Sequence, residues 1–158
     1  MRHIIAILLQ NEAGALSRVA NLFSTRGYNI ESLAVAPTDD PTVSRLTLVT
    51  TGNDAVIAQI GSQLHKLIDV VDVIDLTEGA HFERELLLLK LKAKPTQLQP
   101  LQELVAATMG HILSNEPHGF VVELTGSEAQ VSRFLAQVTE YAEILEVVRS
   151  GALGIAHQ

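Results

Sequence analysis

Apolar positions in the first half of the chain alternate between short continuous runs and helical spacing. Runs of strand length cover residues 3–9, 29–35, 43–50 and 70–76. An apolar stripe at helical spacing predicts an amphipathic helix that ends at Gly27. Its residues are Leu16, Val19, Ala20 and Phe23. A second stripe, after Gly52-Asn53, consists of Ile57, Ile60, Leu64, Leu67 and Ile68. The order β-α-β-β-α-β is typical of a ferredoxin-like unit, an antiparallel four-stranded sheet with two helices on one face.

The second half of the chain repeats this order. Its predicted strands cover 85–92, 120–124 and 144–148, with another beginning at 112–113, and its predicted helices cover 98–109 and a segment after 126–127. Thr25–Ile30 aligns with Thr108–Leu113 at an offset of 83 residues, and Val70–Ile74 aligns with Ile144–Val148 at an offset of 74. The sequence therefore predicts an α+β protein of two ferredoxin-like units. The predicted divisions are a domain at 1–77, a linker at 78–82 and a domain at 83–158.

Composition narrows the classes of function. Eighteen acidic and eleven basic residues give a net charge of -7. A protein that binds the phosphates of nucleic acid would carry a positive charge instead. The absence of cysteine excludes disulfides, thiolate metal sites and thiol catalysis. The longest apolar run, Leu86–Leu89, is far shorter than the roughly 20 residues of a membrane span, and Met1–His3 lacks the pattern of a signal peptide. We therefore expect a cytoplasmic protein that binds neither nucleic acid nor a membrane.

The sequence contains no recognisable catalytic motif. Its six histidines lack zinc-site spacing, and no glycine motif for nucleotide phosphates occurs. His111 and His118 flank a predicted hairpin and could meet across it, although paired surface residues are favoured over a metal site there. Asp39 and Asp40 lie between two prolines and are interpreted as solvated turn residues. We expect no catalytic residue, metal site or bound cofactor in this chain.

The segment Asn11–Leu16, between the first predicted strand and helix, is a candidate binding loop. Gly14 and Ala15 leave room for a ligand near the N–H groups of the first helical turn, where the helix dipole favours a carboxylate. The Asn11 amide both donates and accepts hydrogen bonds, which suits an amino acid. On these residues alone a plainer alternative is favoured, in which Asn11 caps the helix and Gly14 permits a tight turn.

The whole chain resembles the small regulatory subunit of acetohydroxyacid synthase (acetolactate synthase), an enzyme of branched-chain amino-acid biosynthesis. The resemblance extends through Gly151 and is most specific between Arg26 and Pro41. The stretches that carry it are residues 11–19, 22–24, 26–33, 35–41, 44–45, 63–67 and 84–85. The segment Lys94–Gln102 resembles the family least.

The resemblance implies an ACT domain in the first unit and a protein without catalytic residues. Such a subunit binds and activates a large catalytic subunit, which carries thiamine diphosphate, Mg²⁺ and usually FAD, and makes it sensitive to feedback inhibition by valine. ACT domains of this kind pair side by side into an eight-stranded sheet, which implies a homodimer with the effector at its interface. The implied valine-binding residues are Asn11, Gly14, Ala15 and Leu16 of one chain, Asn29 and Ile30 of the second chain, and Ala36 nearby.

A free-standing ACT-type amino-acid sensor without an enzyme partner is the alternative, and an enzyme on this scaffold is the least favoured interpretation. The second unit favours the regulatory subunit, because a simple sensor would not need it. This unit is predicted not to hold an amino acid in the equivalent place. The residues that correspond there to Asn11, Gly14 and Asn29 are Lys94, Gln97 and Ile112.

Overall fold

The computed structural model describes residues 1–158 and divides them into two compact units. The first unit comprises residues 1–82 and 152–158, and the second comprises residues 83–151. The predicted linker at 78–82 ends where the second unit begins, but a strand, β5 (His81–Ala93), starts within it. The last seven residues, which the prediction assigned to the second domain, lie in the first unit because they pack on its sheet.

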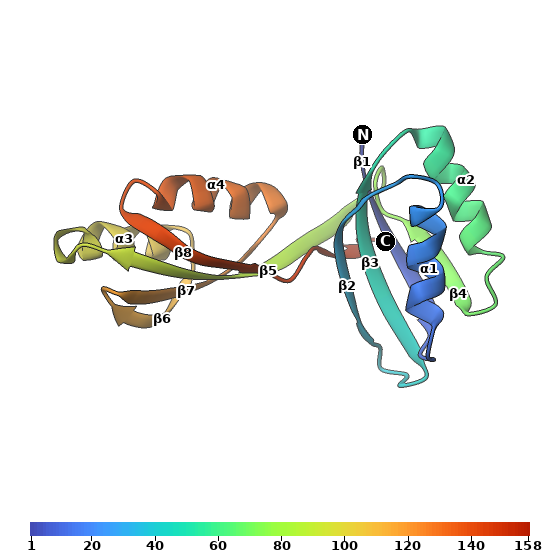
Figure 1. The fold of residues 1–158 in the computed structure, drawn as a ribbon, viewed down its shortest axis with the longest axis horizontal. Coiled ribbons are helices and arrows are strands. Elements are labelled where there is room, and N and C mark those ends of the chain that lie inside the picture. The colour runs from blue at the N-terminus through green and yellow to red at the C-terminus, as the bar shows by residue number, and fades with distance from the viewer. The chain divides into compact units, whose positions relative to one another are not determined.

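The first unit has the predicted β-α-β-β-α-β order, with both helices on one face of its sheet (Figure 1). Its strands are β1 (Arg2–Gln10), β2 (Ile30–Pro37), β3 (Val43–Thr51) and β4 (Val70–Asp75). Its helices are α1 (Ala15–Ser24) and α2 (Asp54–Leu64). All strand pairings are antiparallel in the order β2-β3-β1-β4, so β2 and β4 are the edges.

The helix-facing side of this sheet forms the main core of the first unit. Alternate residues of β1, among them Ile5 and Ile7, point at the helices and pack with Phe23 of α1 and Ile60 of α2. The predicted second helix extended through Ile68 and was too long. After Leu64 the chain tightens into turns, so the helical stripe stops there and the Ile68 side chain is 88% exposed.

A short ninth strand, β9 (Leu153–Ala156), is absent from the prediction and belongs to the first unit. The Ala152 N–H donates to Ser32 Oγ at 3.2 Å, and Arg45 Nη2 donates to the Gly154 carbonyl at 2.8 Å. Gly154 lies so close to the sheet that a Cβ there would stand 2.7 Å from a Leu76 methyl group. The C-terminal segment therefore covers part of the sheet face opposite the helices.

The second unit repeats the topology, with the sheet order β6-β7-β5-β8. After β5, its further strands are β6 (His111–Glu116), β7 (Gly119–Gly126) and β8 (Ala142–Arg149). A 3-10 turn (Pro95–Gln97) precedes its helices, α3 (Leu98–Ala107) and α4 (Glu128–Val138). The prediction of two ferredoxin-like units is thus confirmed. No helix of the chain is long and apolar enough to cross a lipid bilayer.

The core of the second unit again lies between the sheet and its helices. Leu87, Leu89 and Leu91 alternate along β5 and are buried against α3 and α4. The predicted turn at residues 115–119 was too long, because β6 continues through Glu116 and β7 starts at Gly119. The extended pairing satisfies backbone groups that a longer loop would leave to solvent.

Candidate effector-binding site

The loop between β1 and α1 is held by the hairpin beside it. The Asn11 N–H donates to the Thr42 carbonyl at 2.8 Å, and Asn11 Nδ2 donates to the Pro41 carbonyl at 3.1 Å. Asn11 therefore does not cap the helix, and that part of the plainer alternative is wrong. Asp40 rigidifies the hairpin, because its carboxylate accepts hydrogen bonds from the Thr42 hydroxyl and N–H, which lower the pKa of Asp40.

Gly14 occupies the N-cap position of α1 in the left-handed region, with φ of +87°. Because it brings no side-chain acceptor, the first helical turn has no capping side chain there. The tight turn in the plainer alternative is thus present, and it leaves the helix N-terminus accessible to an anion. Around this turn Leu16 is exposed, whereas the Ala15 side chain is buried in the core and supports the loop from below.

Arg18, one helical turn after Gly14, adds a positive charge to this loop that the sequence analysis did not single out. A Cβ on Gly14 would stand 3.1 Å from Arg18 Nη1. Arg18 Nε donates to the buried carboxylate of Asp69, and this hydrogen bond with its charge raises the pKa of Arg18. The i, i+4 spacing from Gly14 is the signal that could have identified Arg18, but Asp69 is 51 residues away in the sequence.

The seven predicted site residues fall at two opposite ends of the first unit's sheet. Asn11 and the start of α1 follow the last residue of β1, and Ala36 on β2 pairs with Arg45 at the same end. Ile30, next to Asn29, pairs with Thr50 at the other end, and Thr50 in turn pairs with His3. From His3 to Asn11 an extended chain covers about 26 Å. One chain therefore brings together five of the seven residues and leaves Asn29 and Ile30 far from them.

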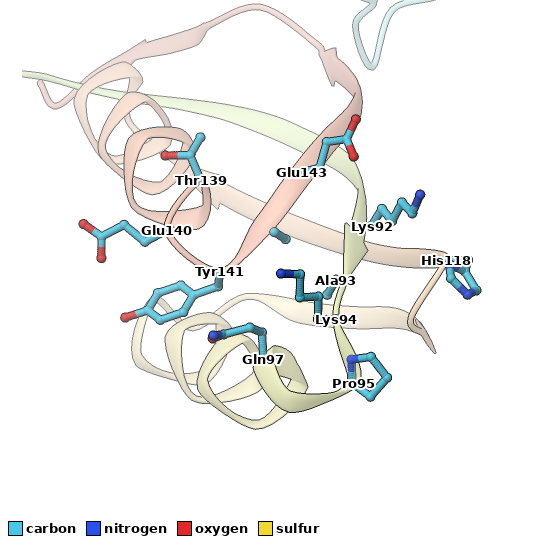
Figure 2. A pocket seen from close by; sticks show the side chains of 11 residues that line it. Lys92, Ala93, Lys94, Pro95, Gln97, His118, Thr139, Glu140, Tyr141 and Glu143 are labelled. Carbon is cyan, nitrogen blue, oxygen red and sulfur yellow. The ribbon is translucent and has the colours of Figure 1, made fainter.

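The cavities in the chain lie away from the seven predicted site residues. One of about 680 Å³ lies in the second unit at the loop after β5, which is the counterpart of Asn11–Gly14 (Figure 2). Two smaller ones of about 270 Å³ lie elsewhere. None of these three contains any of the seven predicted residues. The lining of the large cavity is Lys92, Ala93, Lys94, Pro95, Gln97, His118, Thr139, Glu140, Tyr141, Ala142 and Glu143.

The two histidines that flank the β6–β7 hairpin do not meet. His111 starts β6 opposite Glu123, with 3.9 Å between Nδ1 and a Glu123 carboxylate oxygen. His118 lies in the turn at the other end of β6, which pairs with β7 from His111 to Glu116 with one irregularity between Ile112 and Ser114. No group of three or more histidine, aspartate or glutamate side chains is placed to hold a metal ion.

Comparisons with known proteins agree across the chain. Residues 5–72 match the family described as AHAS small subunit-like ACT domain, and residues 84–158 match the small subunit of acetolactate synthase. The small subunit of acetolactate synthase isozyme 3 from Escherichia coli K12 is 48% identical over 99% of this chain and 96% of its own length. A probable acetolactate synthase small subunit from Archaeoglobus fulgidus is 39% identical over 98% of this chain and 96% of its own. The crystal structure of the small subunit from Thermotoga maritima superposes with a TM-score of 0.87 at 32% identity, covering 100% of this chain and 98% of that one.

The fold and these matches define an ACT domain followed by a second ferredoxin-like domain of the small-subunit type. The chain belongs to the acetolactate synthase small-subunit family, as its resemblance predicted.

Proposed function

We propose that the chain is the regulatory subunit of acetolactate synthase, without catalytic residues of its own. It binds and activates the thiamine-diphosphate-dependent large subunit and confers feedback inhibition by valine on the synthesis of valine, leucine and isoleucine. The observation that carries this proposal is the near full-length match, over both units, to proteins named as small subunits of that enzyme. Thiamine diphosphate, Mg²⁺ and FAD are then expected on the large subunit.

The valine site in this proposal forms where two copies pair through β2. A two-fold axis that is perpendicular to the sheet and passes between two copies, beside the middle of β2, aligns the two β2 strands antiparallel. Ile30 of one copy then lies beside Ala36 of the other, at the end that carries Asn11 and Gly14. Pairing thus removes the separation of about 26 Å between the two half-sites.

The opposite edge strand, β4, would not assemble this site. β4 pairs with β1 on the side away from β2, with Ile7 opposite Val73. Two copies joined there would leave Asn29 and Ile30 at outer edges, still remote from any helix N-terminus. The distribution of the predicted residues therefore supports β2 as the dimer edge, and an eight-stranded sheet also covers its exposed backbone groups.

The paired half-sites provide the groups that an aliphatic amino acid needs. The α1 N-terminus at Gly14, with Arg18 beneath it, suits the carboxylate. The Asn11 amide lies within the same loop and offers an oxygen for the ammonium group. Leu16 and Ile30 supply aliphatic surface for a branched side chain.

Reconstitution with the large subunit from the same organism tests the function. The chain alone is expected to form no acetolactate from pyruvate, whereas adding it to the large subunit should raise activity and make it sensitive to valine. Binding of valine without any effect on the large subunit would instead support the free-standing sensor. Turnover by the rigorously purified chain would refute its non-catalytic role.

Two matched valine substitutions test the dimer edge. Val35 on β2 and Val71 on β4 are both exposed, at 45% and 56%. Val35→Lys should weaken self-association in sedimentation velocity, because it places two lysines at the paired edge, whereas Val71→Lys should not. Loss of association with Val71→Lys alone would move the dimer to β4 and contradict the shared site.

A further inference from the structure

The cavity of about 680 Å³ in the second unit lies between two loops at one end of its sheet (Figure 2). One loop joins β5 to α3 and begins at Lys94, and the other, residues 139–141, joins α4 to β8. Cavities that bind small molecules typically measure about 300–1,000 Å³ and combine an apolar lining with a few well-placed polar groups. The volume of this cavity therefore suits a small-molecule ligand.

The first unit closes the corresponding space with an ion pair. There the Arg18 guanidinium reaches from α1 to Asp69, in the loop before β4. The residue aligned with Arg18 at the offset of 83 is Leu101, which is buried in the core of the second unit. The residue aligned with Asp69 at the offset of 74 is Glu143, which lines the cavity. Because a leucine cannot form the ion pair, the space between the two loops stays open in the second unit.

The loop after β5 is held in place by its own backbone. The Ala93 N–H donates to the Pro117 carbonyl at 2.8 Å, and the Gln97 N–H donates to the Lys94 carbonyl at 2.8 Å. Pro95 restricts the residue before it, Lys94, to the extended conformation, with ψ of 144°. This wall of the cavity is therefore fixed before a ligand binds, which lowers the cost of ordering it on binding.

Three side chains on the two walls can donate hydrogen bonds into the space between them. Lys94 and Gln97 come from the loop after β5, and Tyr141 comes from the loop before β8. In Figure 2 the Lys94 side chain points from the end of β5 toward Tyr141, with Gln97 beside them. None of the three side chains has a hydrogen bond or ion pair within the chain. Their donors are thus available to a ligand whose oxygens accept several hydrogen bonds.

The charges around the cavity favour one negative charge on the ligand. Lys92 and Glu143 occupy opposite positions on β5 and β8, so their charges offset each other. Glu140 and His118 are exposed, and in Figure 2 both point away from Lys94. Lys94 remains as the cation that faces the space between the loops. A phosphate with two negative charges would bring one charge without a partner, whereas a carboxylate brings one charge for one ammonium group.

We propose that this cavity binds a small organic carboxylate. Its carboxylate group contacts Lys94 and the other two donors, and its apolar body lies on Ala93, Pro95 and Ala142. An amino acid is disfavoured because its ammonium group, attached next to the carboxylate, would come close to the Lys94 ammonium. The ligand is therefore of a different class from valine, and this site is separate from the loop at Gly14.

Alanine methyl groups report the two sites separately in NMR spectra of the full-length chain. Ala93 and Ala142 line the cavity, whereas Ala15 lies under the loop of the first unit. We expect isovalerate, which is valine without its ammonium group, to shift the Ala93 and Ala142 signals in a saturable way. The neutral isovaleramide should bind at least about tenfold more weakly, because it lacks the charge. Valine should leave the Ala93 and Ala142 signals unchanged.

Two substitutions on the wall test the role of the donors. Lys94→Gln should weaken carboxylate binding about tenfold or more, because it removes the charged donor. Gln97→Glu should weaken it further, because it replaces a neutral amide with a negative charge. The control is Lys66→Gln, which removes the same charge from an exposed position of the first unit and should leave binding unchanged. Thermal unfolding of each variant confirms that it is folded before affinities are compared.

The proposal is refuted if isovalerate, hexanoate and benzoate all fail to shift the Ala93 and Ala142 signals in a saturable way. Equal affinity for isovalerate and isovaleramide, or an equal loss with Lys66→Gln, would overturn the assignment of the carboxylate to Lys94. Saturation by valine or inorganic phosphate at lower concentration than by the carboxylates would show another class of ligand and overturn the proposal. The valine response of the reconstituted enzyme tests the proposed function separately, because that response depends on the loop at Gly14.

Discussion

Gly14→Asp places a carboxylate where the carboxylate of valine is expected, and its effect on folding can be separated from its effect on binding. Gly14 has φ of +87°, a conformation that costs an ordinary L-residue about 1–2 kcal/mol. Aspartate and asparagine tolerate it better than most residues, so we expect a loss of about 1 kcal/mol in folding stability. The new side chain would meet the end of Arg18, 3.1 Å from the Cβ position, and that flexible guanidinium can move.

The same carboxylate should nearly abolish valine binding. It competes with valine for Arg18 and for the N-terminus of α1, and juxtaposed like charges cost several kcal/mol. A loss of about 3 kcal/mol corresponds to more than a hundredfold in affinity. Gly14→Asn is the matched control, because it has nearly the same size and the same left-handed backbone without the charge. We expect it to shift the midpoint of valine inhibition by less than about tenfold.

The assay is acetolactate formation by the complex with the large subunit, measured against valine concentration. Both variants should activate the large subunit as wild type does, because the substitution removes no group that the first unit's core uses. Equal shifts for Gly14→Asp and Gly14→Asn would show that space rather than charge decides binding. A wild-type midpoint for a folded, activating Gly14→Asp variant would refute the location of the valine site.

Three substitutions test the packing. Gly52→Ala should destabilise the first unit by about 1–3 kcal/mol in chemical denaturation, because its Cβ would stand 1.9 Å from the Tyr28 ring, and an unchanged midpoint would contradict this. Arg149→Met should destabilise the second unit by about 1–3 kcal/mol, since it leaves the buried Glu85 carboxylate without the guanidinium that donates to it at 2.9 Å. Met109→Gly should raise the thermal midpoint by relieving a φ of 60° worth about 1 kcal/mol, and a lowered midpoint would show that the exposed methionine packs in solution.

The order of elements could be predicted because each buried stripe has its own period along the chain. Alternation in β5 and the i, i+3, i+4 spacing of α1 are local patterns, and both survive in the structure. β9 could not be found this way, because its four residues include Gly154 and its partners are remote. Ser32 lies 120 residues away from Ala152 in the sequence, and Arg45 lies 109 away from Gly154.

For the candidate site, too, the sequence predicted what depends on neighbouring residues and missed what depends on remote ones. The Asn11–Leu16 loop was identified because its residues are consecutive and their types suit a ligand. The role of Arg18 was missed because it depends on Asp69, which reaches it only when β4 folds beside β1. The alignment at an offset of 83 sets Gly110 opposite Gly27, but the positive φ that Gly27 has in the first unit falls on Met109 in the second. Gly110 is instead closely packed, with Val105 and the Glu123 carbonyl near its absent side chain.

The placement of half-sites at opposite ends of one sheet has a thermodynamic consequence under the proposed pairing through β2. Each dimer then contains two equivalent sites, and each takes Asn11 from one chain and Ile30 from the other. A ligand that binds only the paired form stabilises that form by mass action, so valine and dimerisation must strengthen each other equally. Under this pairing, the effector acts on the association of two chains rather than on a cavity within one chain. Under the proposed function, a bound large subunit would respond to this change in the contact between two chains, neither of which alone contains the complete site.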